Sequence, residues 1–202
     1  MSRLRGLRPE ELSDEQRALY ESIAGGDRAR DASFRLTEAD GSLVGPFNAL
    51  LLSPVVGNAL QAVGAAIRFG CDLSPLVREV AILTVAAHWR SGFEWWAHEP
   101  IARRAGLSDD RIRDLYSGRT PAFDNEPAAA AHALSRALLA GRRPDEEVFD
   151  LARDLFGPAG VMELVTLVGY YNLLAQLMQT FDVDVPAGEL SPFRTGCPFS
   201  PS

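Results

Sequence analysis

The chain has 202 residues, of which 47% are hydrophobic and 23% are charged, a composition typical of one globular domain with or without a tail. Its formal net charge is −7 and no stripe of basic residues is visible, so nucleic acids and anionic membranes are poor candidate partners. All 20 basic residues are arginine, which excludes catalysis through a lysine Schiff base.

Helical patterns run through nearly the whole chain, starting in its N-terminal part. The stretch Ser13–Gln16 matches a capping box, which opens a short helix that we expect to end near Gly25. The polar, glycine-containing residues that follow predict a long loop. Residues 46–70 then predict one or two apolar helices, with an interruption at Ser53-Pro54.

The middle of the chain predicts a buried helix followed by a helix rich in aromatic residues. The Ser-Pro pair at 74–75 is a typical helix start, and the segment LVREVAILTVAAHWR after it is apolar on almost every side. Ser91-Gly92 is expected to end this helix. The segment GFEWWAHEPIARRAG predicts a second helix that contains Pro100 and ends at Gly106.

The C-terminal half predicts more helices and an extended end. LSDDRIRDLYSG predicts a short capped helix, and further helices are expected at about 124–141, 145–156 and 159–181. No β-alternation or internal repeat is visible, so the predicted fold class is all-α, a single-domain helical bundle. The predicted parts are an N-terminal helix and loop (1–45), a helical domain (46–182) and an extended C-terminal tail (183–202).

The cysteines and the termini predict a cytoplasmic protein. Cys71 and Cys197 lie far apart and form no CxxC pair, which favours a reduced compartment. The N-terminal sequence MSRLRGLRPEEL lacks the apolar segment of a secretory signal. No uncharged apolar run approaches the ~18 residues of a membrane span, so no membrane partner is expected.

Two acidic residues and a histidine are the main candidates for chemistry. Glu79 lies on the apolar helix, where burial is costly without a partner, and it can be either half of an ion pair with Arg90 or a functional carboxylate. Glu94 and His98 are four residues apart and share a helix face. They can form a surface pair worth about 0.2–0.5 kcal/mol. They can equally form an acid–base pair, because histidine exchanges protons near neutral pH.

Other side chains allow further interpretations. The tryptophans, Trp95 among them, are core or interface residues, or else a wall against which a substrate stacks. Tyr171 brings a hydroxyl into an apolar helix and needs a structural or ligand partner. A protein-bound metal is not expected, because HEPIARR lacks the second histidine of HExxH and the chain has only 3 histidines.

Several segments together resemble a known family. LSPLVREVAILTVA, FEWWAHEPIARRAGLSDDRIRDLYSG and LVGYYNLLAQLMQTFDVDVP, with GSLVGPFNALLLSP upstream, are similar to the carboxymuconolactone decarboxylase family over about residues 40–186. This family includes the alkyl-hydroperoxidase D-like peroxidases. The resemblance implies an all-helical fold and a homo-oligomer with active sites at or near subunit contacts.

The resemblance also implies roles for individual positions. In the peroxidase branch a glutamate, two cysteines and a histidine follow a spacing that falls here on Glu79, Ser91, Glu94 and His98. Both cysteines are therefore replaced, and the thiol chemistry that reduces peroxides is not expected. The remaining acid–base groups resemble those of the decarboxylase branch, whose reactions need no metal or organic cofactor.

We therefore predict a cofactor-independent lyase or isomerase that acts on a small oxygenated carbonyl compound or lactone acid. In this prediction the histidine delivers a proton, a glutamate orients it, and an arginine holds a carboxylate or enolate oxygen. Two alternatives are a non-catalytic, oligomeric ligand-binding protein on the same fold and a peroxidase that uses Cys71 or Cys197. The predicted site residues are His98, Glu79 and Glu94 for catalysis, and Arg90, Trp95 and Tyr171 for substrate binding.

Overall fold

The computed structural model describes residues 2–26 and 34–193. Within these ranges the chain is helical except for loops and one isolated bridge between Thr37 and Leu43, which confirms the all-α prediction. The elements are η1 (Pro9–Glu11), α1 (Asp14–Ala24), α3 (Pro46–Leu50), α4 (Pro54–Phe69), α5 (Pro75–Trp89), α6 (Gly92–Arg104), α7 (Asp109–Tyr116), α8 (Glu126–Leu139) and α9 (Glu146–Phe181).

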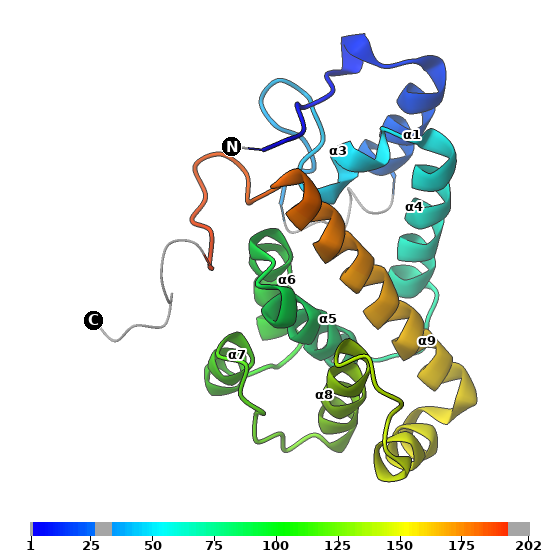
Figure 1. Ribbon diagram of the computed structural model, residues 1–202, viewed down its shortest axis with the longest axis vertical. Helices are drawn as coiled ribbons and strands as arrows, with labels where there is room; N and C mark the ends of the chain where they lie inside the picture. Colours follow the sequence, from blue (N-terminus) through cyan, green and yellow to red (C-terminus); the bar gives the residue numbers. More distant parts are fainter. Residues whose placement is uncertain (1, 27–33, 194–202) are drawn as a thin grey trace.

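The long helix α9 crosses the molecule and separates two groups of helices (Figure 1). On one side lie the N-terminal helices α1, α3 and α4, and on the other side lie α5 to α8. Both groups contact α9, which packs against α3, α4, α5 and α8. A cavity beside α9 can therefore take side chains from distant parts of the sequence.

The helix starts follow the signals that the sequence carries. The Ser13 hydroxyl accepts the N–H of Gln16, whose side chain in turn accepts the N–H of Ser13, so the predicted capping box opens α1. At the start of α5 the Ser74 hydroxyl accepts the N–H of Val77. Each cap satisfies an N–H group that has no acceptor inside the helix, which fixes where the helix begins.

The element α9 consists of two helical parts joined at a kink, which agrees with the two helices that the sequence predicts at about 145–156 and 159–181. Gly157 has a φ of 67° and a ψ of 172°, outside the helical range, and Pro158 follows it. Glycine adopts this positive φ without steric cost, and proline has no N–H to continue the ladder. The chain therefore changes direction between the two predicted helices without a loop.

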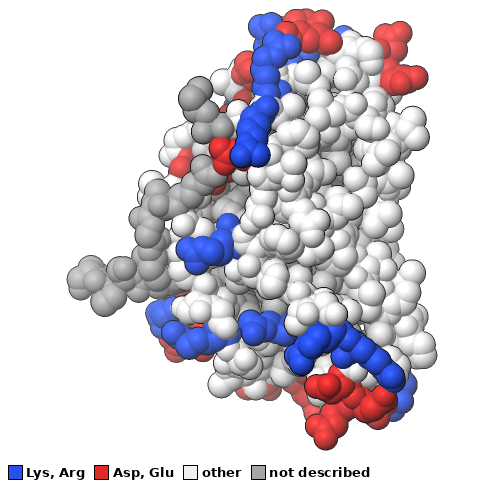
Figure 2. Space-filling model, viewed as in Figure 1, with Lys and Arg blue, Asp and Glu red and all other residues white. Residues whose placement is uncertain are grey.

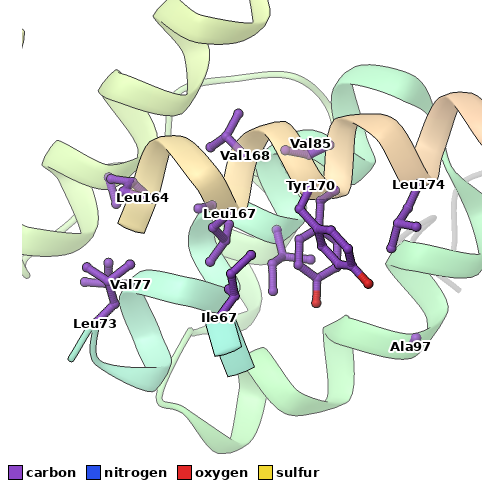
Figure 3. Close-up of a cluster of buried hydrophobic side chains, with 14 of the residues drawn as sticks. Ile67, Leu73, Val77, Val85, Ala97, Leu164, Leu167, Val168, Tyr170 and Leu174 are labelled. Atoms are coloured by element: carbon purple, nitrogen blue, oxygen red, sulfur yellow. The ribbon is translucent and has the colours of Figure 1, made fainter. Parts of the chain in front are cut away.

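The helix α5 is the centre of the hydrophobic core. It packs against α6, α8 and α9, and Val80, Ala81, Leu83 and Val85 on it have no solvent exposure. Figure 3 shows part of this core, including Val77 and Val85 of α5 and the side chains of α9 around Leu167. Because each large apolar side chain contributes roughly 1.5–3 kcal/mol when fully buried, this packing holds α5, α6 and α9 in fixed relative positions.

The turn between α5 and α6 sets the position of the aromatic helix. Arg90 takes a left-handed conformation (φ 49°, ψ 43°) that ends α5, and α6 starts two residues later and folds back against α5. Pro100 lies inside α6, and the helix continues through it to Arg104. The side chains of α6 that face α5 and α9 can thus meet residues of both helices.

The described part of the C-terminal tail returns to the protein. Residues 183–193 are not helical, and Pro192 accepts a hydrogen bond from the Tyr116 hydroxyl at 2.6 Å. The Phe193 ring stacks on Tyr116 with 4.8 Å between the ring centroids. These contacts attach the tail to α7.

The helix α9 is also apolar enough to raise the question of a membrane. It has the length and the mean hydropathy (1.3) of a membrane span. However, 44% of its most apolar window is buried inside the protein, and the core helix of a soluble domain passes the same test. The length and hydropathy of α9 are therefore only weak evidence for a membrane span.

Candidate functional site

A hydrogen bond between two neighbouring helices forms the centre of the candidate site. Nδ1 of His98 on α6 lies 2.8 Å from Oε2 of Glu79 on α5, and the two residues are only 8% and 6% exposed. A carboxylate can only accept, so Nδ1 carries the hydrogen and Nε2 is the nitrogen that can exchange a proton with a ligand. Glu79 therefore pairs with His98, and the alternative ion pair with Arg90 is not formed.

Two tyrosines of α9 complete the surroundings of this histidine. The Tyr171 ring meets the His98 ring edge to face, with 5.2 Å between centroids, and the Tyr170 ring packs on Tyr171 at 5.5 Å. Figure 3 shows Tyr170 extending from α9 toward the helix that carries Ala97, which is α6. Such ring contacts hold the imidazole in one orientation. The structure thus brings the predicted Tyr171 to His98.

Glu94 lies one helical turn before His98 and is almost completely buried. It is 3% exposed, and neither of its carboxyl oxygens has a hydrogen bond to the described residues. Burial raises the pKa of Glu94 well above its usual value, and the nearby Ser91 hydroxyl opposes this effect only in part. The neutral form of the carboxyl is therefore favoured, and a neutral carboxyl can donate a proton.

Both Glu94 and His98 line one pocket, which we call the site cavity. It holds about 520 Å³ of empty space, including its opening to solvent, and lies among α3, α4, α6, α9 and the segment before α3. The predicted N-terminal part and the predicted helical domain therefore both contribute to it. Most of its walls are apolar, and five are aromatic rings: Phe34, Phe47, Phe93, Tyr170 and Tyr171.

A second pocket, which we call the Glu79 hollow, shares His98 with the site cavity and is also lined by Glu79. It holds about 470 Å³ of empty space and is lined by Glu79, His98, Tyr171 and Arg68 among others. His98, Tyr171 and Arg68 line both pockets. The imidazole thus lines both the pocket of its carboxylate partner and the cavity that a substrate can enter.

The structure does not bring two of the predicted substrate-binding residues to the site cavity. Arg90 lies in the turn after α5, where its guanidinium stacks on the Phe193 ring at 4.9 Å and lines a different hollow. Trp95 has no solvent exposure, donates its indole N–H to Glu99 at 3.0 Å and packs against Tyr116 of α7. Trp95 is therefore a core residue, because its side of α6 is covered by α7.

Arg68 is the residue of the cavity that sequence reasoning missed. It lies in the last turn of α4 and supplies the positive charge that was assigned to Arg90. One signal was present, since Arg68 is the single charged residue in the sequence of the otherwise apolar α4. The sequence does not state how α4 is oriented relative to α6, and this concealed the connection.

The described residues contain no cluster of three or more His, Cys, Asp or Glu side chains that could hold a metal ion. Cys71 is half-buried, and its thiol donates to the Ile67 carbonyl at 2.8 Å without lining the site cavity. Cys197 lies outside the described residues. The chemistry that this cavity offers is consequently that of a carboxylate-bound imidazole and a buried carboxyl.

Comparison with known families matches residues 54–137 to the model described as "Carboxymuconolactone decarboxylase family". The matched segment runs from the start of α4 into α8, so it includes Arg68, Glu79, Glu94 and His98. A comparison with curated protein sequences finds no match.

Solved structures with the same fold cover nearly the whole chain. The debrominase Bmp8 in complex with 2,3,4-tribromopyrrole has a TM-score of 0.69 and 14% identity, over 93% of this chain and 95% of that chain. An AhpD-core, peroxidase-related protein from Ralstonia eutropha JMP134 has a TM-score of 0.71 and 16% identity, over 95% of each chain. A peroxidase-related protein from Silicibacter sp. TM1040 has a TM-score of 0.69 and 16% identity, over 93% of this chain and 92% of that chain.

Proposed function

We propose, from the match of residues 54–137 to the carboxymuconolactone decarboxylase family, that the chain is a cofactor-independent lyase or isomerase. Its substrate in this proposal is a small oxygenated carbonyl compound or lactone acid in the cytoplasm. One observation carries the proposal: a histidine held by a carboxylate and a buried carboxyl without a partner line the same aromatic cavity. A debrominase on the same fold supports an enzymatic role.

The two groups have complementary roles in such a reaction. In an isomerisation, Nε2 of His98 takes a proton from the carbon beside the carbonyl group, and the electron pair of the C–H bond moves toward the carbonyl oxygen. The neutral Glu94 donates a hydrogen bond or its proton to that oxygen. The Glu79 carboxylate stabilises the imidazolium that forms, and the proton then returns to a different carbon.

In a decarboxylation the same residues act on a different bond. The C–C bond to the carboxylate breaks, carbon dioxide leaves, and the electron pair is delocalised into the conjugated carbonyl system. Glu94 stabilises the charge on its oxygen, and the imidazolium form of His98 delivers a proton to the carbon. This is the role that the sequence predicts for His98, which either Glu94 or Glu79 was expected to orient, and the hydrogen bond to Glu79 supports Glu79.

The test is turnover of carbonyl and lactone acids without added metal or cofactor, followed by NMR in deuterated water. We expect deuterium incorporation or loss of carbon dioxide for at least one compound, and we expect the variant Cys71→Ser/Cys197→Ser to keep this activity. Peroxide consumption that disappears in the same variant would instead establish the thiol peroxidase alternative. Binding without turnover of any compound would favour the ligand-binding alternative, which the largely apolar walls of the cavity also allow.

We further propose that the partner of this chain is a second copy, which covers an apolar face of α4 and α9. Figure 2 shows a broad area without charged residues on the side where these two helices lie in Figure 1. Val55 of α4 and Met162 of α9 are 80% and 65% exposed. Contiguous exposed apolar patches mark interaction sites on a protein surface. Two copies can bury this face against each other without opposing like charges.

We expect the wild-type chain to sediment as an oligomer and the variants Val63→Asp and Val165→Asp, which place a charge in the apolar face, to dissociate. Leu190→Asp is the matched control, because Leu190 is exposed but lies beyond α9. Analytical ultracentrifugation distinguishes the species. A wild-type monomer, or dissociation by Leu190→Asp alone, would contradict the proposed interface.

A further inference from the structure

The lining of the site cavity contains two polar groups of different charge, Arg68 and Glu94. Arg68 lines both the site cavity and the Glu79 hollow, close to His98. At the other polar group of the cavity, Glu94, the carboxyl has no hydrogen bond within the described chain and no solvent to share, because the residue is 3% exposed. One polar group of the cavity is thus permanently positive, while the other is forced toward neutrality by burial.

We propose that Arg68 binds the single anionic group of the substrate and that Glu94 binds a neutral oxygen of the same molecule, so the site selects planar monoanions. This proposal rests on the proposed function, since it names the substrate class of the same cavity. It assigns Arg68 as the residue that determines specificity.

The geometry of an arginine suits this role. A guanidinium offers a fixed fork of N–H donors that matches the two oxygens of a carboxylate. The aromatic walls exclude water, which strengthens such a charge-assisted hydrogen bond. The other arginine of the Glu79 hollow, Arg78, does not line the site cavity. Arg68 is therefore the arginine that reaches the site cavity itself.

The part of the ligand that contacts Glu94 must be neutral. A second carboxylate beside Glu94 would lose its water among aromatic rings and meet no arginine there, since Arg68 is the one arginine of the described chain that lines this cavity. A carbonyl oxygen has a much smaller desolvation cost and can accept the proton of the neutral Glu94 carboxyl. The five aromatic side chains of the walls favour a flat ligand.

Three ligands of similar shape test separately whether the site requires one anionic group and one neutral oxygen. 3-Acetylbenzoate has one carboxylate and one neutral carbonyl, isophthalate replaces the carbonyl group by a second carboxylate, and 3-acetylbenzamide has no charge. Isothermal titration calorimetry on the full chain should show binding of 3-acetylbenzoate, with isophthalate and 3-acetylbenzamide each at least about tenfold weaker. Equal or tighter binding of isophthalate, or no binding of 3-acetylbenzoate, would overturn the proposal.

Variants assign the anion to one arginine. Arg68→Met should weaken 3-acetylbenzoate by about 10–100-fold, the range expected for a lost charge-assisted hydrogen bond, and should leave 3-acetylbenzamide unchanged. Arg104→Met, an exposed position on α6, is the matched control and should bind like the wild type. Arg68→Lys keeps the charge, so partial recovery in a variant with a wild-type melting curve shows that the loss is not one of folding.

Two outcomes keep this proposal separate from the proposed function. Selective binding of the monoanion that depends on Arg68, in a protein that turns over no substrate, would support the inference and contradict the enzymatic proposal. Turnover of a carbonyl compound with unchanged binding in Arg68→Met would do the reverse. Loss of 3-acetylbenzoate binding in Arg90→Met but not in Arg68→Met would return the role to the residue that the sequence suggested.

Discussion

Replacing His98 with glutamine is expected to lower turnover by about 10²–10⁴-fold, the usual contribution of a general acid–base group. Glutamine has a similar size and can still donate a hydrogen bond to Glu79, but it cannot take up or release a proton at the position of Nε2. The measurement is kcat and kcat/KM on the substrate found by NMR, together with a thermal melt. A folded His98→Gln protein with full activity would eliminate the proposed mechanism.

Two further variants show whether the effect belongs to the site. His88→Gln is the matched control, because His88 lies at the end of α5 and lines neither the site cavity nor the Glu79 hollow. Glu79→Gln should lower kcat with a smaller effect on KM, since the amide can still accept from Nδ1 but cannot stabilise an imidazolium. A lowered melting temperature with intact kcat in Glu79→Gln would indicate that the Glu79–His98 pair is structural.

Spacing along α6 predicts the neighbourhood of Glu94 and His98, whereas the link between Glu79 and His98 comes from the family resemblance. Glu79 and His98 are 19 residues apart, and the short turn between α5 and α6 brings them to 2.8 Å. Helix periodicity also places Glu94 beside His98 on α6. Periodicity within one helix is readable from the sequence, but the contact across the turn between α5 and α6 is not, because spacing alone left Arg90 as an alternative partner of Glu79.

Other parts of the site depend on packing between helices far apart in the chain. Arg68 and Tyr170 reach the cavity from α4 and α9. The hydrophobic periodicity of these two helices does not predict that both residues face α6. The roles of the tryptophans could not be predicted for the same reason, since only the position of α7 decides that Trp95 is core. Arg90 was a reasonable candidate by spacing, yet its left-handed backbone directs it to Phe193.

Replacing Glu94 with methionine is expected to stabilise the protein and to lower turnover by about 10²-fold. Methionine has a similar length and removes a buried polar group whose lack of partners costs about 1–3 kcal/mol. At pH 8 the melting temperature should therefore rise by several degrees, because about 1 kcal/mol corresponds to roughly 2–4 °C in a chain of this size. Chemical and thermal denaturation at several pH values measure the gain.

The pH dependence of this gain identifies its cause. Burial raises the pKa of Glu94 in the folded state well above its usual value of 4.5, so the folded protein binds this proton more tightly than the unfolded chain. The wild-type protein therefore loses stability as the pH rises from about 4.5 toward the folded pKa, and the advantage of Glu94→Met grows over the same range. Glu21→Met, an exposed position on α1, should show no such trend. A gain in stability of Glu94→Met that does not change with pH would mean that Glu94 finds a hydrogen-bond partner in solution. Wild-type turnover in Glu94→Met would mean that His98 alone carries the proton in the cavity.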